Sequence, residues 1–145
     1  MNLVTINGIT GAVASAAGAV IGFAFGHWTE ALTFLLIAIA ADIITGTYAS
    51  VKEGRGLNSA VGSVGLAKKG LMFLVILLAH RMDVLLDMQA VTMSTVVYFY
   101  IANEMVSFVE NIGRAGLPLP GAIKKLIEVL KDKGGVEDNK KGSNV

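Results

Sequence analysis

Four apolar stretches, each close to the length of a membrane-spanning helix and joined by short polar segments, constrain this chain more than any other feature. They cover residues 3–25, 31–51, 70–86 and 91–109. A helix needs about 20 apolar residues to cross roughly 30 Å of hydrocarbon. A chain of 145 residues that is 54% hydrophobic and 16% charged also has more apolar surface than one small water-soluble core can bury. The sequence therefore predicts an all-α integral membrane protein with three to four transmembrane helices.

The apolar stretches differ in how clearly they predict a crossing. Residues 31–51 are rich in Leu, Ile and Phe and contain Asp42 as their only charge, so they form the clearest span. Residues 3–25 carry no charge but consist largely of Gly and Ala, which leaves open whether they span the membrane or lie at its interface. The third stretch is short and would need residues 64–67 as well to reach across.

The membrane domain is expected to cover residues 1–113, because the composition changes after it. Residues 114–145 hold more than half of the Lys and Arg residues and form a basic tail. Pro118 and Pro120 prevent a helix from continuing. Apolar residues at helical spacing, with charged residues between them, then predict an amphipathic helix over residues 121–133. The polar residues that follow it are expected to be disordered.

Basic residues cluster in two places and predict the orientation in the membrane. One is a presumed loop over residues 52–69, and the other is the tail. Cytoplasmic loops carry the excess of Lys and Arg, so both segments and the C-terminus are expected in the cytoplasm. Five lysines are candidates for contact with the membrane surface or for regulation. They are Lys68, Lys69, Lys124, Lys125 and Lys131.

Asp42 is the first candidate functional residue, because lipid cannot hydrogen-bond a carboxylate near the middle of a span. Its insertion costs roughly 2.5 to 3.5 kcal/mol. Two interpretations stay open. Either the carboxyl group forms hydrogen bonds between packed helices, or it lies on a wetted surface that forms when several copies assemble.

A second polar set lies at the end of the fourth stretch. At helical spacing its members form one strip on an otherwise apolar helix. The strip either packs against another helix or lines water in an oligomer, and the residues alone do not choose between these. Its members are Asn103, Glu104, Ser107, Glu110 and Asn111.

Three glycines at four-residue intervals, Gly18, Gly22 and Gly26, predict a smooth face on the first stretch where helices can approach closely. The alternative is that they mark a loosely helical segment at the interface. A charged group near the end of the third stretch, which includes His80 and Asp83, is interpreted as a solvated helix end rather than as a metal or catalytic site.

Catalysis and nucleic-acid binding are not expected. The chain has no cysteine, which excludes thiol nucleophiles and cysteine-ligated zinc, and it contains none of the common catalytic or nucleotide-binding motifs. A formal net charge of +1 gives no global field that would attract nucleic acid. No cofactor and no metal ion are expected.

Several short motifs follow one another in a characteristic order between Gly26 and Lys131. They are Asp42-Ile43-Ile44-Thr45-Gly46, Leu57-Asn58-Ser59 with Gly62 and Gly65, Lys68-Lys69, Asn103-Glu104 with Ser107 and Glu110-Asn111, and Gly116-Leu117-Pro118-Leu119-Pro120 before the amphipathic helix. Each motif is short, but their ordered combination resembles the phage holin family, which includes clostridial toxin-release holins.

The resemblance implies a small protein that accumulates in the cytoplasmic membrane of a bacterial host and assembles with itself. It would then open lesions that release an endolysin or a toxin, or collapse the membrane potential. Its partners would be the lipid bilayer, other copies of itself and the released protein, without a cofactor. The resemblance also adds Thr45 and Gly46 to Asp42 as pore or assembly candidates.

Two other functions fit the same pattern of residues. In a small oligomeric ion channel or transporter, Asp42 and Glu104 would form a defined path for ions or protons, although no inverted repeat supports it. In a membrane anchor, the basic tail would recruit another protein or anionic lipid.

Overall fold

The computed structural model describes residues 3–56 and 59–135, and this part of the chain forms five α-helices. The helices are α1 (Leu3–Phe25), α2 (Glu30–Lys52), α3 (Ser59–Leu86), α4 (Val91–Arg114) and α5 (Gly121–Lys133). The expected all-α class is confirmed. The expected disorder beyond residue 135 lies outside the described residues, as do Leu57 and Asn58 of the second motif.

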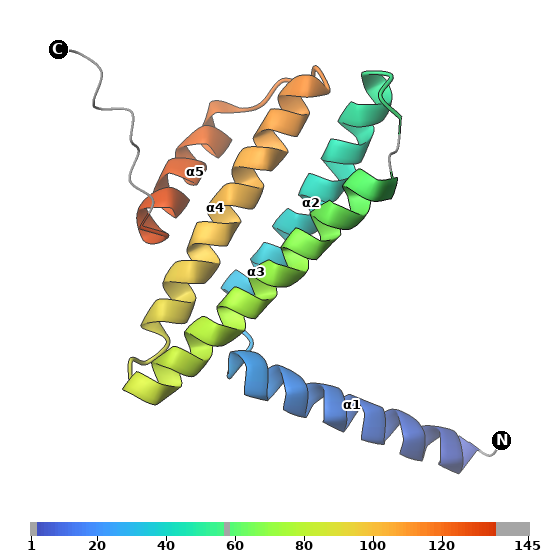
Figure 1. Ribbon diagram of the computed structural model, residues 1–145, viewed down its shortest axis with the longest axis vertical. Coiled ribbons are helices and arrows are strands. Elements are labelled where there is room, and N and C mark those ends of the chain that lie inside the picture. Colours follow the sequence, from blue (N-terminus) through green and yellow to red (C-terminus); the bar gives the residue numbers. More distant parts are fainter. Residues whose placement is uncertain (1–2, 57–58, 136–145) are drawn as a thin grey trace.

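Three helices, α2, α3 and α4, form an up-down-up bundle in which α2 and α4 run in the same direction and α3 runs opposite to them (Figure 1). Both α2 and α3 pack mainly against α4, and they contact each other little. The amphipathic helix α5 turns back after the proline segment and lies along α4. Helix α1 extends away from the bundle and touches α3 only near its own C-terminal end.

The core of the bundle lies around α4. Five of its large side chains are at most 2% exposed: Leu32 and Leu35 of α2, Ile76 of α3, and Val97 and Ile101 of α4. The apolar face of α5 completes this core through Ile127, with Ile123 and Leu130 beside it. Because α4 is covered by other helices, most of its apolar side chains are buried or half-buried within the chain rather than exposed on its outer surface.

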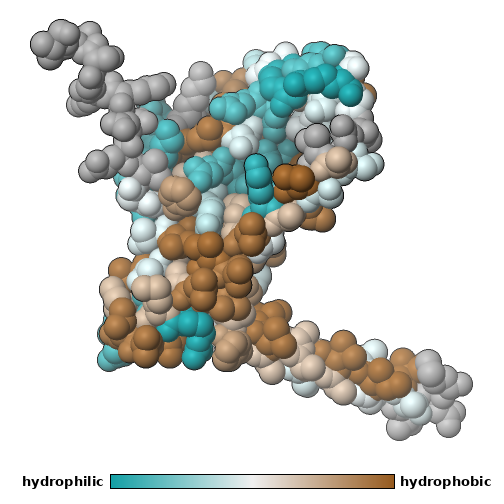
Figure 2. All heavy atoms as spheres, viewed as in Figure 1, coloured by the Kyte–Doolittle hydropathy of each residue, from teal (hydrophilic) through white to brown (hydrophobic). Residues whose placement is uncertain are grey.

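The outer surface of the bundle is apolar over much of its length. Figure 2 shows mainly hydrophobic residues over α1 and the lower bundle, while hydrophilic residues gather where α2 ends, α3 begins and α5 lies. Three helical segments in the described residues are long and apolar enough to cross a membrane: Thr5–Phe25, Glu30–Lys52 and Gly62–Leu86. Helix α4 is not among them, because Asn103, Glu104 and several hydroxyl side chains lower its mean hydropathy.

Helices α1 and α5 begin and end at the expected residues, whereas α3 differs from the expectation. It begins at Ser59 rather than at residue 70, so residues 59–69 are helical and not part of a cytoplasmic loop. The segment contains no proline, and Lys69 finds partners on two neighbouring helices, which offsets the low helix propensity of its glycines.

Gly26 lies just outside α1 and forms the turn that leads to α2. Its φ of +63° is a left-handed conformation that glycine adopts without strain, and the ring of His80 lies so close that a Cβ atom would be 2.7 Å from His80 Cε1. The ring of Phe25 packs edge-on against Trp28 and Phe73. These contacts fix the direction in which α1 leaves the bundle.

The turn between α3 and α4 is held by Asp83, which is only 3% exposed. Its carboxylate accepts hydrogen bonds from the backbone N–H groups of Thr92 (2.9 Å) and Met93 (2.7 Å). It therefore caps the first turn of α4 from the preceding helix. The interpretation of this charged group as a solvated helix end is wrong for Asp83.

Replacing Asp83 should weaken this turn, because an asparagine can accept hydrogen bonds through only one oxygen and carries no negative charge beside the helix N-terminus. Asp83→Asn is expected to lower the free energy of unfolding by about 1–2 kcal/mol. Chemical unfolding in detergent micelles, followed by circular dichroism, measures the change. Asp87→Asn, at an exposed position in the same turn, is the matched control and should change stability much less. Equal losses in both variants would contradict the capping role.

Candidate functional site

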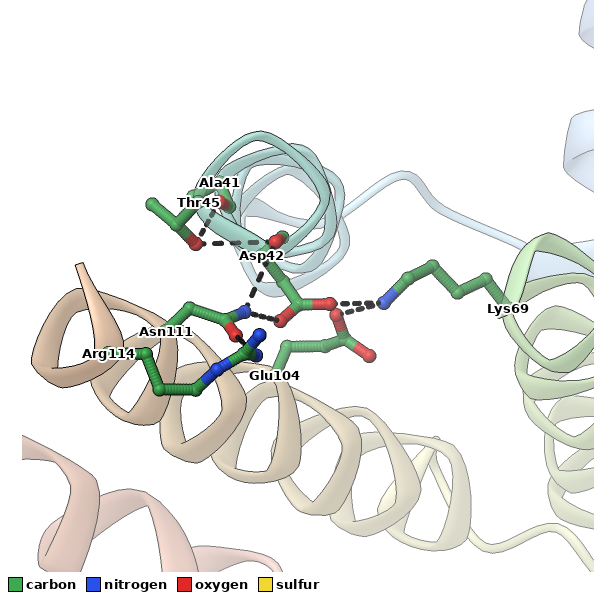
Figure 3. Close-up of polar contacts among 7 residues, drawn as sticks. All are labelled: Ala41, Asp42, Thr45, Lys69, Glu104, Asn111 and Arg114. Atoms are coloured by element: carbon green, nitrogen blue, oxygen red, sulfur yellow. Dashed lines mark hydrogen bonds and ion pairs between the residues drawn. The ribbon is translucent and has the colours of Figure 1, made fainter. Parts of the chain in front are cut away.

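A partly buried ion cluster joins the three bundle helices (Figure 3). The ammonium group of Lys69, on α3, lies 3.0 Å from a carboxylate oxygen of Asp42, on α2, and also contacts the carboxylate of Glu104, on α4. The three side chains are 13%, 17% and 9% exposed, respectively. One cation thus pairs with carboxylates from two different helices at the same level of the bundle.

Asn111 extends the cluster along α4. Its side-chain amide donates to a carboxylate oxygen of Asp42 (3.0 Å), and its amide oxygen accepts from the guanidinium of Arg114 (2.8 Å). The residue is 8% exposed because α2 and α4 approach closely here. A Cβ atom added to Gly46 would lie 3.1 Å from Asn111 Nδ2, so the glycine makes room for this amide.

Arg114 carries the network to the end of the bundle. Its Nε and Nη2 atoms donate to the two carboxylate oxygens of Glu53, at 3.1 Å and 2.8 Å, and Arg55 contacts the same carboxylate. The hydrogen bonds from Arg114 and Arg55 lower the pKa of Glu53 from 4.5 to about 2. The carboxylate therefore stays charged at any physiological pH. We call the set Lys69, Asp42, Glu104, Asn111, Arg114 and Glu53 the polar network.

A groove of about 830 Å³ opens between α2 and α3 along the polar network. It exists because these two helices pack on α4 and are linked to each other by the long side chain of Lys69. Its lining combines network residues with small and hydroxyl residues: Asp42, Ile43, Gly46, Thr47, Ser50, Arg55, Gly56, Gly62, Gly65, Leu66, Lys69, Asn111 and Arg114. The described residues contain no cluster of His, Cys, Asp and Glu suited to a metal ion.

The structure brings together only part of the strip that the sequence indicates on α4. Glu104 and Asn111 are buried in the network, while Asn103 and Glu110 are exposed and Ser107 is half-buried. The strip is therefore divided between two sides of the helix.

Two other candidates near Asp42 have local roles. The Thr45 hydroxyl donates to the backbone carbonyl groups of Ala41 (2.7 Å) and Asp42 (3.2 Å), within its own helix. Gly46 allows the close approach of Asn111, as described above.

The glycines of α1 are not used within one copy of the chain. Nothing lies within 4 Å of a Cβ atom built on Gly18 or Gly22, while Gly26 serves the turn after the helix. The small face of α1 is thus unoccupied, and its role in helix packing stays a prediction.

The candidate surface lysines fall into different environments. Lys68 and Lys125 are exposed, Lys131 is half-buried, and the side chain of Lys124 lies outside the described residues. Lys69 belongs to the polar network and not to a surface loop. The apolar face of α5, which a membrane-surface helix would insert into lipid, packs against α4, so a membrane-surface role for this helix stays a prediction.

Sequence reasoning missed the roles of Lys69, Arg114 and Glu53. A signal for Lys69 was present, because two carboxylates in separate apolar helices require a cation at the same depth, and Lys69 directly precedes the third apolar stretch. Nothing in the local sequence pairs Arg114 with Glu53, which lies 61 positions earlier.

Comparison with known proteins decides the family. The model of the bacteriophage holin family matches residues 19–132, which cover the whole bundle and nearly all of α5. The chain belongs to this family. It is therefore a multi-pass membrane protein of the holin family, whose members are not enzymes.

Individual relatives agree with this assignment. This holin is 37% identical over 123 residues to an uncharacterised protein of Halalkalibacterium halodurans, covering 81% of the chain and 90% of the relative. It is also 37% identical to an uncharacterised protein of Listeria innocua, covering 85% and 87%. A protein of Bacillus phage phi105 named a probable holin is 34% identical over 100 residues, covering 69% and 73%. No solved structure matches the chain.

Removing the cation of the polar network should destabilise this holin, because two carboxylates would then face each other without a counter-charge. Lys69→Met is expected to lower the free energy of unfolding by roughly 3–5 kcal/mol. Lys68→Met, at the exposed neighbouring position, is the control and should have little effect. Thermal unfolding in micelles compares the two.

A rescue variant separates lost charge balance from lost packing. Adding Asp42→Asn and Glu104→Gln to Lys69→Met removes the unpaired charges and should recover most of the loss. If the triple variant is less stable than Lys69→Met alone, charge balance is not what the network provides.

Proposed function

We propose that this holin assembles in the cytoplasmic membrane of a bacterium and permeabilises it, so that an endolysin or a toxin leaves the cell. The observation that carries the proposal is the polar network beneath an open groove, inside a bundle whose outer surface is apolar. Such a chain is held in lipid by its surface but contains polar surface that lipid cannot satisfy. The probable holin of Bacillus phage phi105 supports the same function.

The orientation follows from the charges at the two ends of the bundle. Lys52, Arg55 and Arg114 lie together where α2 and α4 end, close to the start of α3. Cytoplasmic segments carry the excess of basic residues. This end, and with it the segment that leads to α5, therefore faces the cytoplasm.

Helix α4 crosses the membrane together with α2 and α3. It packs along both of them and is joined to α3 by a short turn, so it lies at the same depth. Its lower hydropathy is compatible with a crossing, because Glu104 and Asn111 face the bundle and not the lipid. An even number of crossings, α3 and α4, then separates the two basic segments.

Labelling of single cysteines tests the orientation, since the chain has no native cysteine. Ser59→Cys at the start of α3 should be protected from an impermeant thiol reagent added to sealed spheroplasts. Met88→Cys, exposed in the turn between α3 and α4, should react. The reverse pattern would show that the protein is inserted in the opposite direction.

Expression in a bacterium tests permeabilisation itself. Polar surface that a single copy cannot expose to lipid becomes wet only when many copies meet, so the protein should accumulate without harm and then depolarise the membrane abruptly. A co-expressed muralytic enzyme without a signal sequence should be released at the same moment, which turbidity and a potential-sensitive dye record together.

A selective channel gives a different result. It would produce graded ion flux from the start of expression, and the muralytic enzyme would stay inside. Retention of the enzyme in cells that accumulate abundant wild-type protein would therefore refute release of proteins by this chain. Expression of the muralytic enzyme alone is the control for leakage.

A further inference from the structure

The exposed surface of the bundle has two unlike sides. On α2 and α3 the exposed large side chains at mid-length are apolar, for example Ile37, Ile44, Leu71 and Leu74, which are 50–68% exposed. On the other side, α5 lies over α4 and turns charged side chains outward. Lys125, Glu128, Asp132 and Lys133 of α5 are all exposed.

Helix α4 continues the polar side beside α5. The backbone of Phe99 touches Gly134 at the end of α5, since a Cβ atom on this glycine would lie 2.6 Å from Phe99 Cα. Asn103 and Glu110 follow Phe99 on the same face of α4 at helical spacing, and both are exposed. Charged and amide groups of two helices are therefore exposed on the same side of the bundle.

The position of α5 along α4 places this polar surface at a depth where lipid cannot solvate it. Helix α5 starts beyond the cytoplasmic end of α4 and runs back until Gly134 meets Phe99, with the Lys133 ammonium 5.1 Å from the centre of the Tyr98 ring. Phe99 and Arg114 are about 22 Å apart along the helix axis at 1.5 Å per residue. Half of a hydrocarbon core is only about 15 Å thick. Docked α5 therefore reaches past the membrane midplane.

Lipid cannot surround a helix that exposes charged side chains over this range of depth, because Lys125, Glu128 and Asp132 would lose their hydration there, even though Lys133 lies over the Tyr98 ring. A helix lying on the membrane surface would instead turn its apolar face to lipid, but Ile127, Ile123 and Leu130 of that face pack on α4, and Leu126 and Val129 stay exposed beside them. Water is the environment that satisfies the outward face of α5 while its inward face stays on α4.

We infer that the α4–α5 side of each copy faces water and lines the opening formed by several copies, while the apolar surfaces of α2 and α3 outside the groove face lipid. The inference rests on the proposed function and states which surface of each copy lines the opening. The charges of α5 and the exposed Asn103 and Glu110 of α4 line the opening. The polar network on the other side of α4 holds the bundle together.

Locking α5 on α4 tests whether the docked state is the active one. The variant Tyr98→Cys/Lys133→Cys, treated with a short cleavable bifunctional thiol reagent, should crosslink within one chain in vesicles of phosphatidylethanolamine and phosphatidylglycerol. The locked protein should release an encapsulated dye at a rate within about twofold of the untreated protein. Loss of release that returns when the linker is cleaved would show that α5 must leave α4, and would overturn the inference.

Charge reversal tests whether α5 lines the opening. Glu128→Lys/Asp132→Lys should shift the ion selectivity of early conductances in planar bilayers at least twofold towards anions. Glu30→Lys, an exposed carboxylate at the outer end of α2, is the control and should not shift it. Equal selectivity in all three proteins would place α5 away from the opening and overturn the inference.

A third measurement separates the inference from the proposed function. In the same vesicles, Glu128→Cys should react with a charged impermeant thiol reagent at least tenfold faster than Ile44→Cys on the α2 side. If wild-type protein never releases dye, the proposed function fails, and this reactivity together with the crosslink still decides which side faces water. Equal reactivity, or no crosslink in the bilayer, would refute the assignment of sides.

Discussion

The ammonium group of Lys69 is the contact on which the rest of the bundle depends. Helices in lipid gain no hydrophobic stabilisation from meeting each other, so packing and polar contacts decide their arrangement. Lys69 reaches carboxylates on both α2 and α4 and so sets the relative depth of three helices with one side chain. Because this link is long, α2 and α3 stay apart, and the groove between them follows from the same contact.

The sequence correctly predicts helices whose ends are set by neighbouring residues. It fails for a helix end that residues nearby in the sequence do not indicate. Helix α1 is an uninterrupted apolar stretch, and α5 is bounded by Pro120 and Gly134, so both are located correctly. The first turns of α3 contain Gly62 and Gly65, whose low helix propensity locally favours a loop. The segment leads to Lys69, which is held by residues 27 and 35 positions away, and no local pattern contains that information.

In the candidate site, too, the sequence marks some residues, whereas the roles of others depend on how the helices pack. The cost of a carboxylate in lipid marks Asp42 and Glu104 from the sequence alone. A helical strip does not show which of its edges a neighbouring helix will cover, so Glu104 cannot be distinguished from the exposed Asn103 before the packing is known. Asp83 was missed because its capping role depends on a turn in which Asp87, Gln89 and Ala90 adopt positive φ angles, which those residue types seldom do.

The distribution of charge explains how one chain can be both a stable membrane protein and a source of permeability. In the polar network, cations and carboxylates from different helices face each other, so a single bundle satisfies its most costly groups internally. The exposed charges of α5 face outward from the bundle and require water within the membrane. A single copy surrounded by lipid can supply that water only at its cytoplasmic end. Copies that turn their α5 sides towards one another can share it across the membrane, so permeability becomes a property of the assembly and not of the isolated chain.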